Sequence, residues 1–180
     1  MSRAVFLDRD GVINRALVRN GRPFPPSGLH ELEILPGVPD AMTRLRQAGF
    51  QLIVVTNQPD VARGKTSRET VKAINAKLQS MLPVDEIREC YHDDADDCPC
   101  RKPKPGLLLE AARLRGLNLS RSFMVGDRWR DVEAGQRAGC TTLFIDYGYD
   151  EANHSKPHVR VSSLVEAVEW ILDTMRDDGK

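Results

Sequence analysis

Two aspartates near the start of the chain stand two positions apart and are followed directly by a glycine. Asp8 and Asp10 come after the apolar run 4–7, and Gly11 permits a sharp turn behind them. A carboxylate can attack phosphorus to form an acyl-phosphate, which divides one difficult hydrolysis into two easier steps. A second carboxyl can give a proton to the leaving alcohol and then take one from water. The pair therefore makes Asp8 a candidate nucleophile and Asp10 a candidate general acid and base, although the same pattern also occurs in ordinary turns.

Side chains suited to phosphate binding occur in two further places. Thr56, Asn57 and Gln58 follow a second apolar run, and a hydroxyl or amide there can donate to phosphate oxygens without adding charge. Further on, Lys102 can neutralise both a phosphate and a nucleophile, and the fork of Arg101 can hold a second anionic or polyol group. Each pattern taken alone also fits a plain loop or a solvated basic turn.

Acidic residues follow a later apolar run, 122–125. Asp127 would stand opposite Asp8 in a parallel sheet and would complete a set of oxygen ligands for Mg²⁺, which favours carboxylates and water. Asp131 comes four residues later, where it can orient Lys102 or a metal-bound water. It can equally be an acidic residue that the dipole favours at a helix N-terminus.

A cluster of cysteine and histidine lies in the segment 90–100, just before the basic pair. Cys90, His92, Cys98 and Cys100 supply three thiolates and one imidazole, a set suited to closed tetrahedral zinc. Four protein ligands leave no open position, so such a zinc ion would be structural and would pin the loop that carries the basic pair. The alternative is a group of reduced cysteines without a metal.

Apolar runs alternate with helical patterns along the whole chain. This alternation predicts a doubly wound α/β fold, in which a parallel sheet is covered on both faces and binds ligands at the carboxyl ends of its strands. The segment 14–35 has no clear pattern and should be a loop that lines the site. No linker divides the chain, so we expect one domain over residues 1–180. The expected strands are 4–7, 51–55, 87–91, 122–125 and 141–145, and the expected helices are 38–48, 67–82, 106–115, 130–138 and 161–176.

Composition excludes some classes of partner. The chain of 180 residues has 26 basic and 26 acidic side chains, so it offers no electrostatic footprint for nucleic acid or an anionic membrane. It has no membrane-length apolar run and no signal-peptide pattern, which predicts a cytoplasmic location. We expect a monomer, since no long apolar stripe suggests an obligate dimer, and a small phosphorylated metabolite as its partner.

The motifs together resemble those of the haloacid dehalogenase superfamily of phosphatases over roughly residues 4–146. The resemblance implies that Asp8 is the nucleophile and Asp10 the acid and base. It also implies Mg²⁺ bound by the Asp8 side chain, the Asp10 carbonyl and Asp127, in a fold without a separate cap domain. Val12 departs from the pattern, because many members carry threonine there. The matching motifs are Asp8-x-Asp10-Gly11, Thr56, Lys102 and Gly126-Asp127-x-x-x-Asp131.

A zinc loop before Arg-Lys-Pro resembles two branches of these phosphatases. One acts on D-glycero-D-manno-heptose 1,7-bisphosphate, in carbohydrate metabolism that leads to lipopolysaccharide precursors, and the other acts on histidinol phosphate. The run Val61-Ala62-Arg63-Gly64 after Thr56 favours the heptose branch, whereas the short zinc linker is shared. The basic side chains near the site would suit a second phosphate on a bisphosphate substrate. The expected substrate contacts are Asn57, Gln58, Arg63, Arg101 and Arg128.

Two other classes of protein remain open at this point. A phospho-acceptor signalling module also uses an aspartate with Mg²⁺, but its acidic pair and its acceptor come from different strands. A zinc-loop module for nucleic acid is disfavoured by the zero net charge.

Overall fold

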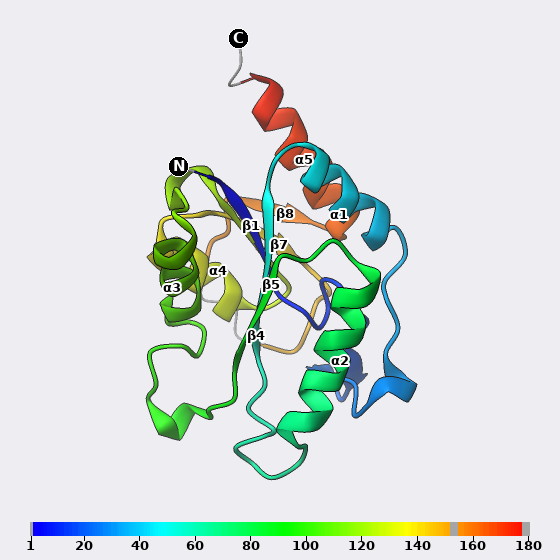
Figure 1. The fold of residues 1–180 in the computed structure, drawn as a ribbon. Helices are drawn as coiled ribbons and strands as arrows, with labels where there is room; N and C mark the ends of the chain where they lie inside the picture. The colour runs from blue at the N-terminus through cyan, green and yellow to red at the C-terminus, as the bar shows by residue number, and fades with distance from the viewer. Residues whose placement is uncertain (1, 152–154, 178–180) are drawn as a thin grey trace.

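A sheet of six parallel strands forms the centre of the protein (Figure 1). The computed structural model describes residues 2–151 and 155–177. The strand order is β5-β4-β1-β6-β7-β8, and every neighbouring pair is parallel. The strands are β1 (Ala4–Leu7), β4 (Gln51–Asn57), β5 (Glu86–Cys90), β6 (Phe123–Gly126), β7 (Thr141–Ile145) and β8 (Val159–Val161).

Helices cover both faces of this sheet, as the sequence predicts (Figure 1). Side chains of successive strand residues point to opposite faces, so Phe6 packs in one apolar cluster and its neighbours Val5 and Leu7 pack in the other. The expected doubly wound α/β fold is therefore confirmed. One face carries α1 (Val38–Gln47), α2 (Arg68–Met81) and α5 (Leu164–Asp177), and the other carries α3 (Gly106–Arg115) and α4 (Trp129–Ala138).

Serine side chains cap the first turns of two of these helices. The hydroxyl of Ser67 accepts the N–H of Thr70 at 3.1 Å, and the hydroxyl of Ser163 accepts the N–H of Glu166 at 3.2 Å. Each bond satisfies a backbone donor that the first helical turn leaves free. Among the described residues, no helix is long and apolar enough to cross a membrane.

The segment between β1 and α1 is more ordered than its sequence suggested. β2 (Leu17–Arg19) and β3 (Arg22–Phe24) form an antiparallel hairpin, so the expectation of a loop was wrong for these residues. Asn20 and Gly21, with φ of 50° and 72°, make its two-residue turn, and Asn-Gly is a strong signal for such a turn. The strands were missed because each spans three residues, and Pro23 argues against a strand except at an edge.

The end of the chain differs from expectation in a similar way. β8 (Val159–Val161) pairs with β7 at the edge of the sheet, and α5 begins at Leu164, not at Val161. His158 helps to place this strand, because its Nδ1 accepts the N–H of Thr142 at 3.1 Å. A three-residue strand is too short to show a periodicity in the sequence, so no strand was predicted here. The helix was therefore expected to begin at Val161, which is the last residue of β8.

The order of the strands fixes where a ligand can bind. The chain starts in the middle of the sheet, winds outward to β5, and then crosses to β6 on the other side of β1. Open α/β sheets bind ligands at the carboxyl ends of the strands where the winding reverses. Asp8 directly follows β1 and Asp127 directly follows β6, so the two predicted acidic residues meet at this point.

Candidate active site

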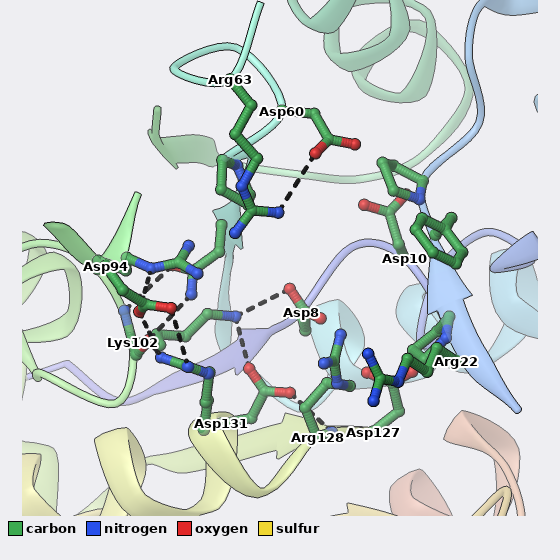
Figure 2. A pocket seen from close by; sticks show the side chains of 17 residues that line it. Asp8, Asp10, Arg22, Asp60, Arg63, Asp94, Lys102, Asp127, Arg128 and Asp131 are labelled. Carbon is green, nitrogen blue, oxygen red and sulfur yellow. Dashed lines mark hydrogen bonds and ion pairs between the residues drawn. The ribbon is translucent and has the colours of Figure 1, made fainter. Parts of the chain in front are cut away.

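Lys102 lies at the centre of the site, and its side chain is 2% exposed (Figure 2). The Nζ atom donates to Asp8 Oδ1 at 2.8 Å and to Asp131 Oδ1 at 2.6 Å. It also donates to the carbonyl of Val55 at 2.7 Å, which uses the third hydrogen of the ammonium group. The buried cation of Lys102 thus links two other residues that were predicted for the site, Asp8 and Asp131.

Asn57 holds the backbone of this lysine in place. Its Nδ2 donates to the carbonyl of Lys102 at 3.0 Å, and its Oδ1 accepts the N–H of Lys102 at 3.1 Å. Asn57 ends β4 and also lines the main pocket. The side chain predicted to contact the substrate therefore also positions the catalytic candidate Lys102.

Burial and like charges perturb the acidic residues of the site. Burial, together with the charge of Asp131, raises the pKa of Asp8 to about 6, although Lys102 opposes the shift. Burial and the charges of Asp8 and Asp131 also raise the pKa of Asp127. Burial alone would lower the pKa of Lys102, but the two carboxylates that it contacts raise it. Three buried carboxylates thus face one ammonium group, which leaves an excess of negative charge.

Asp127 forms no ion pair within the described residues, although Tyr149 and the Arg128 guanidinium oppose the rise in its pKa. It is 1% exposed, and neither carboxylate oxygen has a hydrogen-bond partner among the described residues. Gly11 allows this close packing, because a Cβ atom at that position would lie 1.9 Å from Asp127 Oδ2. Its φ of 89° also favours glycine. An orphaned buried carboxylate is costly, so Asp127 is suited to bind a cation.

The donor set around Asp127 fits a hard divalent metal ion. Asp8, Asp127 and Asp131 each offer a carboxylate oxygen, and these oxygens lie within 4.8 Å of one another. Mg²⁺ prefers oxygen ligands of this kind, and its charge would offset the excess that Lys102 leaves. The side chain of Asp10 is outside this group of carboxylates.

Asp10 is held beside the group by four donors. Its Oδ1 accepts Arg9 Nε at 3.1 Å and Asn14 Nδ2 at 2.9 Å. Its Oδ2 accepts Arg9 Nη2 at 3.1 Å and Gln58 Nε2 at 2.8 Å. Neither Arg9 nor Asn14 was predicted to contact Asp10. A charged residue between two aspartates is usually solvated, and Asn14 reaches Asp10 only because the chain turns between them.

Thr56 and Gln58 lie behind the pocket and not in its wall. Gln58 Nε2 also donates to the Thr56 hydroxyl at 2.9 Å, and both side chains are buried. Gln58 lines a neighbouring cavity of about 230 Å³. The roles of Thr56 in catalysis and of Gln58 in substrate binding stay predictions. The structure shows a hydrogen-bonded link from Thr56 through Gln58 to Asp10.

Arginines surround the main pocket, which has a volume of about 310 Å³ (Figure 2). Most of them already face carboxylates. Arg63 makes two bonds of 2.6 Å to Asp93, and Arg101 donates to Asp94 at 2.8 Å. Arg128 pairs with Glu151, and Arg130 donates to Asp94 at 3.0 Å. The acidic partners reduce the positive charge that these arginines present to a ligand.

Arg22 is the exception among the pocket-lining arginines. It lies on β3 of the hairpin and is exposed, and no carboxylate in the described residues pairs with it. Pro23, Phe24 and Pro25 extend the same wall of the pocket. The segment 14–35 was expected to line the site, but no residue in it was predicted as a contact. Arg22 was missed because the hairpin that orients it was not predicted.

The predicted zinc ligands come together at the end of β5. Cys90 Sγ lies 3.0 Å from Cys100 Sγ and 3.6 Å from both Cys98 Sγ and His92 Nδ1. All four ligand atoms lie within 4.8 Å of one another, and none of the cysteines forms a disulfide. Three sulfurs and one imidazole nitrogen at such spacing fit a tetrahedral zinc ion, whose bonds to sulfur are about 2.3 Å.

Comparison with known proteins agrees with this geometry. A family model described as haloacid dehalogenase-like hydrolase matches residues 26–139. The chain belongs to this hydrolase family. The resemblance found in the sequence is thereby confirmed, and the interpretation as a signalling module or a nucleic-acid module loses its support.

Similar proteins match over nearly the whole chain. The D-glycero-beta-D-manno-heptose-1,7-bisphosphate 7-phosphatase of Escherichia coli K12 is 33% identical over 97% of this chain and 90% of its own. The corresponding enzyme of Thermosynechococcus vestitus is 34% identical over 93% of this chain and 94% of its own. A crystal structure of D,D-heptose 1,7-bisphosphate phosphatase from B. bronchiseptica, complexed with magnesium and phosphate, has a TM-score of 0.79. It is 31% identical and covers 96% of this chain and 99% of that one.

The contact between Gly11 and Asp127 gives a first prediction. In Gly11→Ala the new methyl group must displace the Asp127 carboxylate, so Mg²⁺ should no longer raise the melting temperature. The matched control is Gly49→Ala, which has φ of 84° and open space around the new Cβ atom. Both variants should lose roughly 1–2 kcal/mol through backbone strain, but Gly49→Ala should keep the response to Mg²⁺. An equal response in both variants would contradict the role of Asp127 as a ligand.

Proposed function

We propose that this protein is a Mg²⁺-dependent phosphatase that removes the 7-phosphate of D-glycero-D-manno-heptose 1,7-bisphosphate. The observation that carries the proposal is the buried group at the switch point of the sheet, where Lys102 joins Asp8 to Asp131 and Asp127 has no hydrogen-bond partner in the described part of the chain. The family match and the names of the similar proteins support the reaction and the substrate. The cytoplasmic location, the monomeric state and the single domain stay predictions.

The chain supplies the groups that such a reaction needs. Asp8 attacks phosphorus, the bond from phosphorus to the ester oxygen breaks, and Asp10 gives its proton to the departing alcohol. Water then attacks the aspartyl-phosphate, Asp10 takes a proton from it, and phosphate leaves. Lys102 holds Asp8 in line throughout and neutralises part of its charge. Bound Mg²⁺, held by Asp8, Asp127 and the carbonyl of Asp10, would screen the phosphate from the attacking carboxylate. Asp131 acts indirectly, by orienting Lys102.

The pocket beyond this group has the charge for a second phosphate. Arg22 is exposed on one wall, and Arg63, Arg101 and Arg128 contribute guanidinium groups that their carboxylate partners partly neutralise. A sugar between two phosphates needs both anionic contacts and hydrogen-bonding groups, and this lining offers both. We infer that the distal phosphate lies toward Arg22.

Phosphate release tests the proposed function directly. With Mg²⁺, the wild type should release phosphate from heptose 1,7-bisphosphate with a kcat/KM at least about 10²-fold above that for histidinol phosphate, because only the first substrate carries a distal anion. Asp8→Asn should lower kcat by about 10⁴-fold or more, since the reaction loses its nucleophile.

A matched variant separates loss of the nucleophile from loss of charge. Asp146→Asn removes a carboxylate just after β7, at the same edge of the sheet, where it contacts Arg160 and the N–H of Gly148. It should keep most of the activity. Full turnover by a folded Asp8→Asn variant would rule out the mechanism, whereas a preference for histidinol phosphate would keep the mechanism and change the substrate.

The role of Arg22 can be tested without disturbing the fold, because the side chain is exposed. Arg22→Ala should raise KM for the bisphosphate about tenfold or more, as expected for a lost hydrogen bond between charged groups. KM for a simple monophosphate should change little. Arg19→Ala is the matched control, since it removes a charge from the same hairpin, and Arg19 lines the neighbouring cavity and not the main pocket. Equal effects of the two variants would refute a specific contact.

We further propose a structural zinc ion in the loop at residues 90–100. Purified protein should contain about one zinc ion per chain, measured by elemental analysis. Cys98→Ser should lose it and should lower the melting temperature by about 5 °C or more, because the ion links β5 to the loop that carries Lys102. Cys140→Ser is the control, since this buried cysteine lies outside the cluster. A zinc content unaffected by Cys98→Ser would contradict the assignment.

A further inference from the structure

Arg9 is a fully buried arginine between the two aspartates of the first motif, with an exposed fraction of 0%. A buried guanidinium keeps its charge and must find partners for its donors. The Nε and Nη2 atoms form a fork on the two oxygens of Asp10, at 3.1 Å each. The Nη1 atom donates to Asn75 Oδ1 at 2.8 Å. Each of the three guanidinium nitrogens of Arg9 therefore donates to an identified acceptor of the protein.

The far side of Arg9 is fixed by elements outside the motif. Asn75 lies on α2 and is itself buried, and its Nδ2 donates to Oε1 of Glu89 on β5 at 2.9 Å. The chain of contacts thus runs from β5 through α2 and Arg9 to Asp10. The helix and the strand together set the position of the guanidinium plane, and that plane sets the plane of the carboxyl group.

The contacts restrain Asp10 more than a turn requires. Asn14 and Gln58 donate to the same two oxygens, so each oxygen of Asp10 accepts two bonds. A carboxyl group on a short side chain rotates freely about its terminal bond, and the bidentate fork of Arg9 removes that freedom. Buried ion pairs contribute little net stability, because desolvation offsets their attraction. The arrangement is better explained by orientation than by stability.

We propose that Arg9 is a positioning residue for the reaction: it fixes the direction of the Asp10 carboxyl so that the proton reaches the leaving alcohol. This inference rests on the proposed phosphatase function, in which Asp10 serves as acid and base. Arg9 lines the neighbouring cavity of about 230 Å³ and not the main pocket, so we expect it to contact neither the substrate nor the phosphorus. Its effect passes entirely through Asp10.

The leaving group distinguishes a positioning role from a structural one. An alkyl alcohol needs a proton as it departs, whereas p-nitrophenolate is stable enough to leave without one. The value of kcat/KM reports the steps up to departure of the alcohol. A residue that orients the general acid should therefore matter for a sugar phosphate and matter little for p-nitrophenyl phosphate.

Arg9→Lys keeps the positive charge but loses the fork. With Mg²⁺, it should lower kcat/KM for heptose 1,7-bisphosphate on the order of 10²-fold, the scale of a misplaced catalytic group. For p-nitrophenyl phosphate the loss should stay below about threefold. Asp10→Asn should show the same selective pattern with a larger loss on the sugar phosphate.

A second variant guards against misfolding of Arg9→Lys. Asn75→Ala leaves the fork intact and releases its far side, so it should give the same selectivity with a loss of about tenfold on the sugar phosphate. Ser122→Ala is the control for general destabilisation. Its buried hydroxyl accepts the N–H of Ala4 at 3.0 Å and has no contact with Asp10, so both substrates should change alike.

The outcomes separate this inference from the proposed function. Equal losses on both substrates in Arg9→Lys, or in Asn75→Ala where Arg9→Lys does not fold, would overturn the positioning role. If Asp10→Asn were selective and the other two variants were not, the inference alone would fall. If the wild type released phosphate from neither substrate, the proposed function would fall and the inference with it.

Discussion

The buried ammonium group of Lys102 is the interaction on which the rest of the site depends. It brings Asp8 and Asp131 within hydrogen-bond distance of one nitrogen, although they follow different strands and would otherwise repel each other. Asp127 adds a third buried carboxylate, which has no hydrogen-bond partner among the residues that the structure describes. A divalent cation bound here would balance this excess of negative charge and would also match the oxygen ligands. The sheet makes this possible by placing β1 and β6 side by side.

Lys102 lies in a segment without regular secondary structure. Contacts from several other elements hold this segment in place. Asn57 grips its backbone from β4. Just before it, Cys98 and Cys100 join Cys90 at the end of β5. Asp94 in the same loop pairs with Arg101 and Arg130. A loop restrained at several points loses its conformational freedom before a ligand arrives, which keeps the ammonium group at a fixed distance from Asp8.

The fold and the catalytic candidates could be predicted from sequence because their signals are local. Buried parallel strands are continuous apolar runs, and the residues after them must meet at one edge of the sheet. The four members of the Cys/His cluster were picked out by residue type and spacing alone, and the structure brings them together. The β2–β3 hairpin and β8 could not be predicted in the same way, because three-residue strands carry no period. The ion pairs of the pocket depend on contacts between distant segments, such as Arg130 with Asp94 and Arg128 with Glu151, which no local pattern reveals.

The ion pairs around the pocket bear on turnover as well as on stability. A pocket lined by five unpaired arginines would bind the substrate tightly, but it would also bind inorganic phosphate and retain the product. Asp93, Asp94 and Glu151 lower that affinity by occupying most of the guanidinium groups. Arg22, which no carboxylate of the described residues pairs with, lies on the hairpin and not beside Asp8. Such a distribution favours a ligand with two separated anionic groups over a single phosphate, because one group can lie beside Asp8 while the other lies beside Arg22.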